Sequence, residues 1–329
     1  PPITGTATVQ GELYTTHPYN PATNQKLKYL KASDLSTGID YYTDINGEVT
    51  IPAALGSTIE YSLEGEYAHV FKNGNTASLT QNLASLNIIN FDNSNSTIQE
   101  RSAYWAVNEI HDHLKNIFPT FTDLDVPMVT NVDEWGTCNA FYDGSSINFY
   151  QEGLSQNGTD YCEATGNIAD VVYHEYGHAI NSDRYNGTSW WSGGMENGAL
   201  NEGYADIWAV SLTQSPVLGY GWDLVDPTVF VRRYDENRKV YPQDISGEVH
   251  ADGEIIGIDC GTIVDGYYGD HAKTFSIGKI SNEKKKLMKI TEESLYKGIE
   301  KAVPGNFVGD IGHAVQTHAE SNGFSVVRE

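Results

Sequence analysis

The net charge of the chain changes abruptly near residue 256, and this break most constrains how the 329 residues can fold. Residues 257–329 carry 10 acidic and 9 basic side chains, whereas residues 1–256 carry 34 and 11. Net charges of −23 and −1 on adjacent segments indicate separate modules, each of which needs its own core. The chain is 39% hydrophobic and 11% aromatic, which is enough for two cores.

The composition excludes several partners. A formal net charge of −24 repels nucleic acid and anionic membranes, so we expect neither as a partner. No apolar run approaches the 18 residues of a membrane span. The chain opens with "PPITGTATVQ", without Met or a signal-like segment, so we expect its natural start to have been removed. The oligomeric state is not predictable from these features.

Local patterns predict a mixed, α+β architecture. Residues 1–72 alternate short β-type runs with turn clusters, which predicts a β-rich N-terminal region. A polar stretch leads from there to Thr97 and Glu100, which are spaced as a helix capping box. His111 and His113 follow on this helix, and because they are two residues apart we expect surface histidines rather than ligands. Further patterns predict strands within 138–150 and helices at 167–181 and 198–210.

The segment "HEYGH" places His174 and His178 four residues apart, so on a helix both imidazoles project from one face. Two imidazoles on one face can bind a single metal ion, and Glu175 lies beside them. The alternative is an ordinary helix with two half-buried histidines. The segment therefore predicts a metal site only if a third ligand exists.

The third ligand is expected on a following helix, in "GALNEGYADIWAV". Glu202 supplies a carboxylate there, and Asp206 follows one turn later, where it can accept the second N–H of a ligand histidine. Arg184 occupies the position at which an extended three-histidine motif would have its last histidine. Glu196 is an alternative donor, but it lies in a Gly-rich loop and lacks such a partner.

"HEYGH" followed by "NEGYAD" resembles the thermolysin and fungalysin type of zinc metallopeptidase, the gluzincins, over about residues 97–255 and extending toward residue 1. The resemblance implies a zincin-like catalytic domain that hydrolyses peptide or protein substrates. It also implies the following roles: His174, His178 and Glu202 bind Zn²⁺, Glu175 is the general base, and Asp206 orients His174.

The same resemblance implies residues that contact the substrate. "NAF" matches the family's edge strand, where Asn139 and the backbone of Ala140 hold the substrate peptide as an added strand. Arg232 and His250 are expected to face the substrate, with His250 donating to the developing oxyanion and Asp244 orienting it. Ca²⁺ is left open as a second metal, with no site assigned.

The three cysteines divide in the same way as the charge. Cys138 and Cys162 flank a loop-rich stretch, and a disulfide between them would stabilise the fold by about 3 kcal/mol. Cys260 has no partner left. A cysteine pair suits an oxidising compartment, so we expect the protease-like part to be extracellular.

The tail contains Asp259 and Asp270, eleven residues apart on two strand-like runs. An ordinary hairpin with turn aspartates is the simple interpretation, and helices are expected at 282–302 and 309–322. Residues 257–329, however, resemble a cytosolic methionine aminopeptidase of the bacterial type, a pita-bread α/β fold. In that family the matching aspartates bridge two divalent metals together with three later ligands. These ligands are absent, so we expect at most weak divalent-cation binding.

We therefore expect two truncated enzymes joined near Ile256: residues 1–72 and 97–255 from a zinc endopeptidase, and residues 257–329 from an aminopeptidase. An artificial join is expected, with a natural fusion as the alternative. Three functions compete: a zinc endopeptidase, an incomplete and inactive aminopeptidase fragment, and a catalytically impaired chimera that only binds zinc or peptides. The intact Glu175 favours the first of these functions.

Overall fold

The computed structural model describes residues 4–156, 158–185, 198–236, 246–250, 259–264, 267–272 and 281–327. It divides into two compact units, residues 1–256 and 257–329. The described residues contain both helices and β-sheets, in agreement with the predicted α+β class. Among these residues, no helix combines the length and the apolar composition that a bilayer crossing requires.

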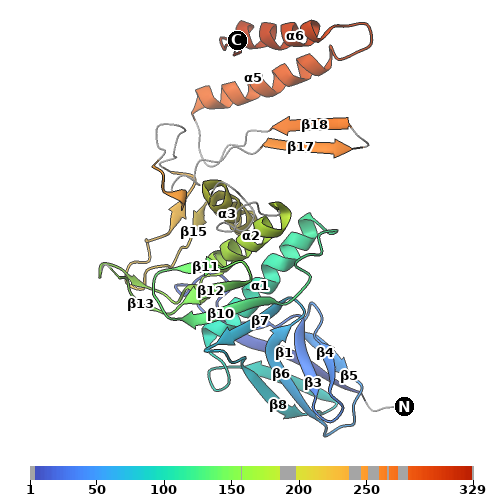
Figure 1. Cartoon of the computed structure of the whole chain (residues 1–329), viewed down its shortest axis with the longest axis vertical. Coiled ribbons are helices and arrows are strands. Elements are labelled where there is room, and N and C mark those ends of the chain that lie inside the picture. Colours follow the sequence, from blue (N-terminus) through green and yellow to red (C-terminus); the bar gives the residue numbers. More distant parts are fainter. Residues whose placement is uncertain are drawn as a thin grey trace. The chain divides into compact units, whose positions relative to one another are not determined.

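Two sheets form the N-terminal part of the first unit (Figure 1). One has the order β2-β1-β5, with β9 added in parallel to β1, and the other has the order β11-β12-β10-β7-β6-β3-β4, with β8 beside β6. The predicted β-rich character of residues 1–72 is confirmed by strands β1 to β7. The bounds are Gly5–Leu13 (β1), Thr23–Lys26 (β2), Leu30–Asp34 (β3), Ile39–Tyr42 (β4), Glu48–Ile51 (β5), Thr58–Gly65 (β6) and Ala68–Lys72 (β7).

The second sheet continues across the boundary that the sequence suggests after residue 72. Strand β7 pairs in parallel with β10, from Ala68↔Met128 to Lys72↔Val132, so both regions share one ladder. The polar stretch between them, for which the sequence predicts no strand, contains two more strands. The further bounds are Ser78–Asn82 (β8), Leu86–Phe91 (β9), Met128–Glu134 (β10), Ala140–Tyr142 (β11), Ser146–Tyr150 (β12), Gly153–Leu154 (β13), Tyr161–Cys162 (β14), Val217–Leu218 (β15) and Arg232–Arg233 (β16).

Helix α1 (Ile98–Ile117) begins at the predicted capping box. Thr97 Oγ1 accepts the backbone N–H of Glu100 at 3.3 Å, and Glu100 Oε2 accepts the backbone N–H of Thr97 at 2.6 Å. The two bonds satisfy N–H groups that a helix start otherwise leaves unpaired, typically worth about 1 kcal/mol. Helix α1 packs on β7 and β10 and also on α2.

The prediction of surface histidines on α1 is wrong for His111, which is only 2% exposed. Its ring stacks on Tyr67 with centroids 3.7 Å apart, and its Nε2 lies 3.1 Å from Asp125 Oδ1. His113 is half-buried, with Nε2 2.8 Å from Ser211 Oγ. The reason is that α1 is covered by protein on more than one side, so residues on different faces of the helix are both enclosed.

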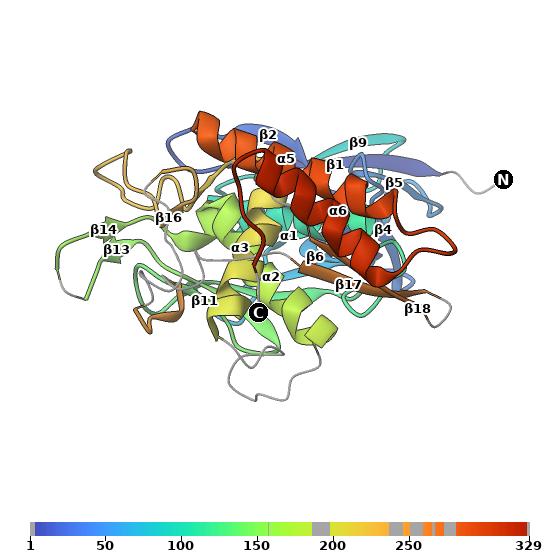
Figure 2. The same ribbon diagram turned by 90° about the horizontal axis from the view of Figure 1, so that it is seen from above.

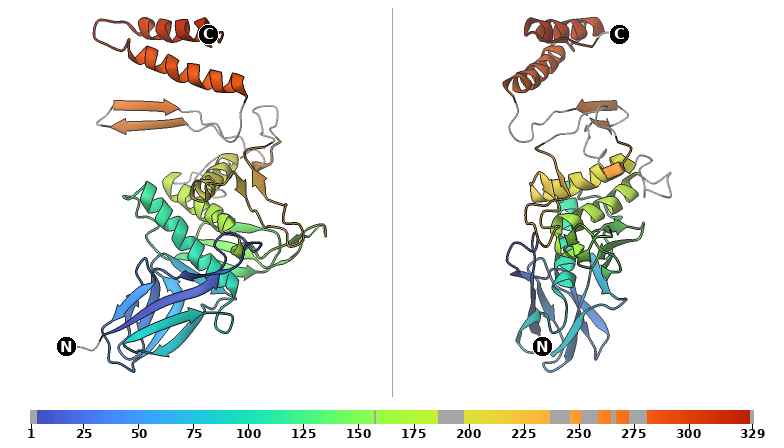
Figure 3. Two further views of the ribbon diagram at one scale, coloured as in Figure 1. Left: turned by 180° about the vertical axis from the view of Figure 1, so that it is seen from behind. Right: turned by 90° about the vertical axis from the view of Figure 1, so that its left-hand side faces the viewer.

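Helices α2 (Ala169–Tyr185) and α3 (Gly198–Thr213) follow, with a short 3-10 helix at Thr165–Asn167 before α2. The apolar stripe of α2 is buried as its spacing predicts, with Ile168 and Val172 fully enclosed. Strands of the first 91 residues gather at one end of the unit, and α2 and α3 lie at the other (Figure 3). The two helices pack directly against each other.

The second unit contains a hairpin and two helices, as predicted. Strand β17 (Asp259–Val264) pairs antiparallel with β18 (Tyr267–Ala272). Helix α5 (Asn282–Ile299) packs on α6 (Val308–Ser321), with the two side by side in Figure 2. Ile290 of α5 and Ala319 of α6 are buried, so the helix pair encloses a small apolar contact.

Candidate metal centre

Three chemically active side chains of "HEYGH" converge on one face of α2. His174, Glu175 and His178 are 5%, 5% and 8% exposed. One nitrogen of each histidine and one carboxylate oxygen of Glu175 lie within 4.8 Å of one another. The two Nε2 atoms are only 3.1 Å apart. The one-face arrangement expected from the spacing is therefore present in the folded chain.

Helix α3 adds a carboxylate to this pair. Glu202 Oε2 lies 3.3 Å from His174 Nε2, and Glu202 Oε1 lies 3.6 Å from His178 Nε2. Gly177 permits this approach, because a Cβ at that position would lie 2.9 Å from Ala205 Cα on α3. Glycine costs about 1 kcal/mol in a helix interior, so a lone glycine there was a signal of close packing that sequence reasoning did not use.

The donor set fits a divalent metal ion. Ligand atoms of a tetrahedral zinc site, about 2.0 to 2.1 Å from the ion, are about 3.3 Å from one another, close to the separations that His174, His178 and Glu202 make. Within the described part of the chain, Glu202 Oε2 also has no hydrogen-bond partner. A buried polar atom without a partner is rare, and a bound ion would account for it. Imidazole and carboxylate are ligands that Zn²⁺ binds well.

Asp206 holds His174 from the side opposite the cluster. Its Oδ1 lies 2.6 Å from His174 Nδ1, and the carboxylate is 2% exposed. Burial by itself lowers the pKa of His174, but the charge of Asp206 and its hydrogen bond outweigh burial and raise that pKa to about 10. Burial opposes ionisation of Asp206, yet His174 and Arg232 hold the pKa of Asp206 well below its ordinary range. A metal ion therefore competes with a proton for His174.

Arg232 and Tyr234 complete the surroundings of Asp206. Arg232 was expected to face a substrate; instead it is buried and donates from Nε to Asp206 Oδ2 and from Nη2 to Asp206 Oδ1, both at 2.6 Å. The Tyr234 hydroxyl also donates to Asp206 Oδ2. A buried carboxylate needs this many donors to stay ionised, which explains the inward position of Arg232.

Glu175 lies beside the ligands in an enclosed position. Burial is the largest influence on it and raises the pKa of its carboxyl above the ordinary value, although His174 and His178 oppose this. A carboxyl group with a raised pKa is better suited to accept and return a proton. The general-base role of Glu175 stays a prediction.

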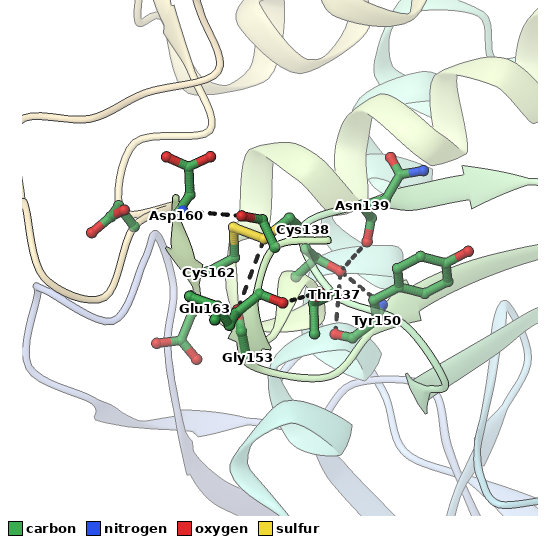
Figure 4. The surroundings of a disulfide bond; sticks show 12 residues. Thr137, Cys138, Asn139, Tyr150, Gly153, Asp160, Cys162 and Glu163 are labelled. Atoms are coloured by element: carbon green, nitrogen blue, oxygen red, sulfur yellow. Dashed lines mark hydrogen bonds between the residues drawn. A yellow bond between two sulfur atoms is a disulfide. The ribbon is translucent and has the colours of Figure 1, made fainter. Parts of the chain in front are cut away.

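The expected edge strand lies next to a disulfide. Cys138 and Cys162 are joined, and β11 begins two residues after Cys138 (Figure 4). Asn139 is exposed, and its backbone oxygen accepts from Thr165 Oγ1 at 2.9 Å. Among the described strands, β11 pairs with β12 alone. Ala140 is the first residue of this strand.

His250 is brought to the cluster as well. Its Nε2 lies 3.4 Å from Glu202 Oε2, although the side chain is 52% exposed. The carboxylate that contacts His250 Nδ1, at 2.7 Å, belongs to Glu248. Asp244, which was expected to orient His250, and Glu196 both lie outside the described residues. The sequence already contained this carboxylate, Glu248, two residues before His250, and its proximity was not used to predict the contact.

The tail aspartates occupy neighbouring positions on the hairpin. Asp259 pairs with Ala272 and Asp270 pairs with Gly261, so the aspartates lie on opposite strands with one residue pair, Cys260↔His271, between theirs. This arrangement satisfies the simple hairpin interpretation. Weak binding of a divalent cation by Asp259 and Asp270 stays a prediction.

The C-terminal part of the chain is similar to known metallopeptidases. Residues 233–329 match metallopeptidase family M24. A methionine aminopeptidase of Clostridium acetobutylicum is 55% identical over 78 residues, which are 24% of this chain and 31% of the relative. Methionine aminopeptidase 1 of Bacillus subtilis is 54% identical over 78 residues, 24% and 32% of the two chains. The chain thus spans about a third of the length of these curated relatives.

A solved structure, the precursor of protealysin, a metalloproteinase from Serratia proteamaculans, aligns with 78% of this chain and 82% of its own at 14% identity. The TM-score is 0.37, which does not establish a shared fold. The comparisons therefore support the methionine aminopeptidase resemblance of the tail. The gluzincin resemblance, secretion of the first unit and the join near Ile256 stay predictions. The M24 match starts at Arg233 and so includes His250.

Proposed function

We propose that the chain is a metal-dependent peptidase whose complete metal site lies in residues 1–256. One observation carries this proposal: the donors of His174, His178 and Glu202 are separated by 3.1 to 3.6 Å, the spacing of ligands around one ion. Zn²⁺ is the ion best suited to two imidazoles and one carboxylate. The substrate class is a peptide or protein.

The residues take distinct roles in this proposal. A bound zinc ion would supply the Lewis acidity that polarises a peptide carbonyl and makes water more acidic. Glu175 accepts the proton of the attacking water and returns it to the leaving amine. Asp206 keeps the proton of His174 on Nδ1, so that Nε2 is free to bind the ion. Arg232 and Tyr234 keep Asp206 ionised and in place.

The substrate would bind along the edge of β11 opposite β12. A peptide added antiparallel to this strand makes main-chain hydrogen bonds, with Asn139 and Ala140 as the nearest contacts. Arg232 contributes through Asp206 in this scheme, since its guanidinium is already bound there. The predicted contact of Arg232 with substrate is therefore not part of the proposal.

A second candidate is an M24-type aminopeptidase, and the comparisons favour it over the endopeptidase. Its support is the 55% identity to a methionine aminopeptidase in the tail. Asp259 and Asp270 would supply two of the metal ligands, with the other ligands missing from this sequence. We expect no methionine release from short peptides, even with added Co²⁺ or Mn²⁺. Turnover that disappears in Asp270→Ala would establish this second function instead.

The test combines metal content with cleavage of a fluorogenic peptide. The purified chain should hold one zinc, His174→Ala and Glu202→Ala should lose it, and Glu175→Gln should keep it while losing cleavage. Glu163→Gln is the matched control, because Glu163 is also a buried carboxylate but accepts from Asn167 and Ala164 outside the cluster. It should behave as wild type in both measurements.

Two results would contradict the proposal. Full zinc retention by Glu202→Ala would remove Glu202 from the ligand set and direct attention to Glu196. Cleavage by Glu175→Gln at the wild-type rate would remove the general base and with it the proposed mechanism.

A further inference from the structure

His250 lies at the exposed rim of the buried cluster and shares a neighbour with the proposed ligands. Its Nε2 is 3.4 Å from Glu202 Oε2, the same oxygen that lies 3.3 Å from His174 Nε2. Neither imidazole makes a hydrogen bond of good geometry to that oxygen, which has no partner in the described part of the chain. Two ring nitrogens therefore approach the same carboxylate oxygen.

The other nitrogen of His250 identifies its tautomer. Nδ1 is 2.7 Å from Glu248 Oε1, and the same oxygen accepts the backbone N–H of His250 at 3.2 Å. A neutral imidazole carries one proton, and a carboxylate beside Nδ1 places that proton there. Nε2 then has a free lone pair. His174 has the same arrangement, with Asp206 beside its Nδ1 at 2.6 Å. Carboxylate–histidine pairs of this kind accompany metal-binding histidines.

We propose that His250 is a fourth protein ligand of the metal ion, bound through Nε2 beside His174, His178 and Glu202. The inference rests on the proposed function, because it requires an ion in the cluster. The 3.4 Å separation from Glu202 Oε2 matches the edge of about 3.3 Å in a tetrahedral zinc site. Four protein ligands close such a site, whereas a catalytic site keeps one position for water or substrate.

His250 is also the ligand that can leave. The side chains of His174, His178 and Glu202 are 7%, 10% and 14% exposed, against 52% for His250. Val249, the residue before His250, packs closely against the start of α3. A Cβ added to Gly198, the first residue of α3, would lie 2.9 Å from Val249 Cγ1. His250 thus occupies the position that water or a substrate carbonyl needs. It acts as an inhibitory ligand that substrate must displace.

This role differs from the predicted oxyanion donor. An oxyanion needs an N–H, and with Nδ1 protonated toward Glu248 a neutral His250 has none at Nε2. Only the doubly protonated ring could donate there. The two roles therefore make opposite demands on the same atom.

The test measures zinc in the intact chain. X-ray absorption at the zinc edge of the one-zinc protein should show three imidazole ligands. In His250→Ala it should show two, and competition with a chromophoric chelator should give a zinc affinity lower by a factor on the order of 100. Glu248→Gln should weaken zinc binding by about tenfold, since the amide still accepts from Nδ1 but carries no charge. His318→Ala is the matched control, because its Nε2 faces Glu293 Oε2 at 3.0 Å within the second unit.

The outcomes separate this inference from the proposed function. Two imidazoles in wild type, or equal zinc affinity of His250→Ala and wild type while His174→Ala loses the metal, would overturn the fourth ligand and leave the metal site intact. A wild-type chain that binds no zinc would overturn both. Wild-type absorption needs no variant, so the result does not depend on whether His250→Ala folds.

Discussion

Gly177 on α2 and Ala205 on α3 are in backbone contact: a Cβ at position 177 would lie 2.9 Å from Ala205 Cα and 3.0 Å from its carbonyl oxygen. Neither neighbouring atom belongs to a flexible side chain, so an added methyl group must move one helix. Because α2 carries the histidines and α3 carries Glu202, this contact sets the distance between the two halves of the donor set.

Gly177→Ala should weaken zinc binding by tenfold or more, although alanine favours the helix itself by about 1 kcal/mol. Chelator competition measures the affinity. Gly312→Ala in α6 is the control, because no atom lies within 4 Å of its added Cβ, and it should leave zinc binding unchanged. Unchanged zinc affinity in Gly177→Ala would mean that the spacing of α2 and α3 does not control the site.

Tyr234→Phe removes one donor to the buried carboxylate of Asp206. We expect a loss of about 1.5 to 3 kcal/mol in the free energy of unfolding, as for hydrogen bonds to charged groups. Zinc affinity should fall by about tenfold, since Asp206 then orients His174 less well. Urea unfolding and chelator competition measure the two effects. Tyr42→Phe, an exposed tyrosine on β4, should change neither; an equal loss in both variants would refute a role for Tyr234 at the site.

Asp170 should make the first unit less stable as the pH rises from about 4 to 7. Burial is the main cause that raises its pKa from 3.8 to about 7; Oδ2 accepts from the Gly219 N–H, whereas Oδ1 has no side-chain hydrogen-bond partner in the described residues. In this window the folded protein holds a proton that the unfolded chain releases, so the free energy of unfolding falls with pH, by at most about 4 kcal/mol.

Asp170→Asn should therefore gain stability over wild type at pH 8 and show little difference at pH 4. Urea unfolding followed by tryptophan fluorescence measures this, because all six tryptophans lie within residues 1–256. A difference between variant and wild type that is the same at both pH values would show that Asp170 does not titrate in this range.

Removal of residues 257–329 should leave zinc affinity within about twofold of the full chain. The proposed ligands all lie between His174 and His250, in the first compact unit. Because residues 257–329 supply no proposed ligand, their removal is expected to have little effect on the zinc affinity of the first unit. Zinc content and chelator competition on the truncated chain test this. Loss of zinc on truncation would mean that the tail supports the site, and a peptidase assay on both chains would show whether it also supports cleavage.

The local features of the fold were predictable because their signals are local. The capping box of Thr97 and Glu100 and the four-residue spacing of His174 and His178 depend on neighbours within one turn of helix. Strand β9 was missed because its first half departs from the usual alternation: Leu86 and Ile88 are 70% and 59% exposed while Asn87 is buried, and only Ile89 and Phe91 follow the ordinary pattern. Asn87 compensates by donating to the backbone of Thr6 and Ala84, which no sequence pattern reveals.

The long-range features of the site could not be predicted for the same reason. Arg232 reaches Asp206 across 26 residues, and its burial follows from a charge that must be paired. His111 is enclosed because Tyr67, far away in sequence, stacks on it. Spacing indicated the residues to which the proposal assigns the chemistry, whereas the side chains that contact them come from distant parts of the sequence.

The ladder between β7 and β10 has a consequence for synthesis. A growing chain leaves the ribosome N-terminus first, so β7 exists before β10, and both exist before the helices that carry the proposed ligands. The sheet can assemble as a platform while α2 and α3 are still being made. A shortened product that starts after residue 72 would expose an unpaired strand edge along β10, and such edges recruit other chains. The first strands thus protect the nascent protein from aggregation as well as supporting the site.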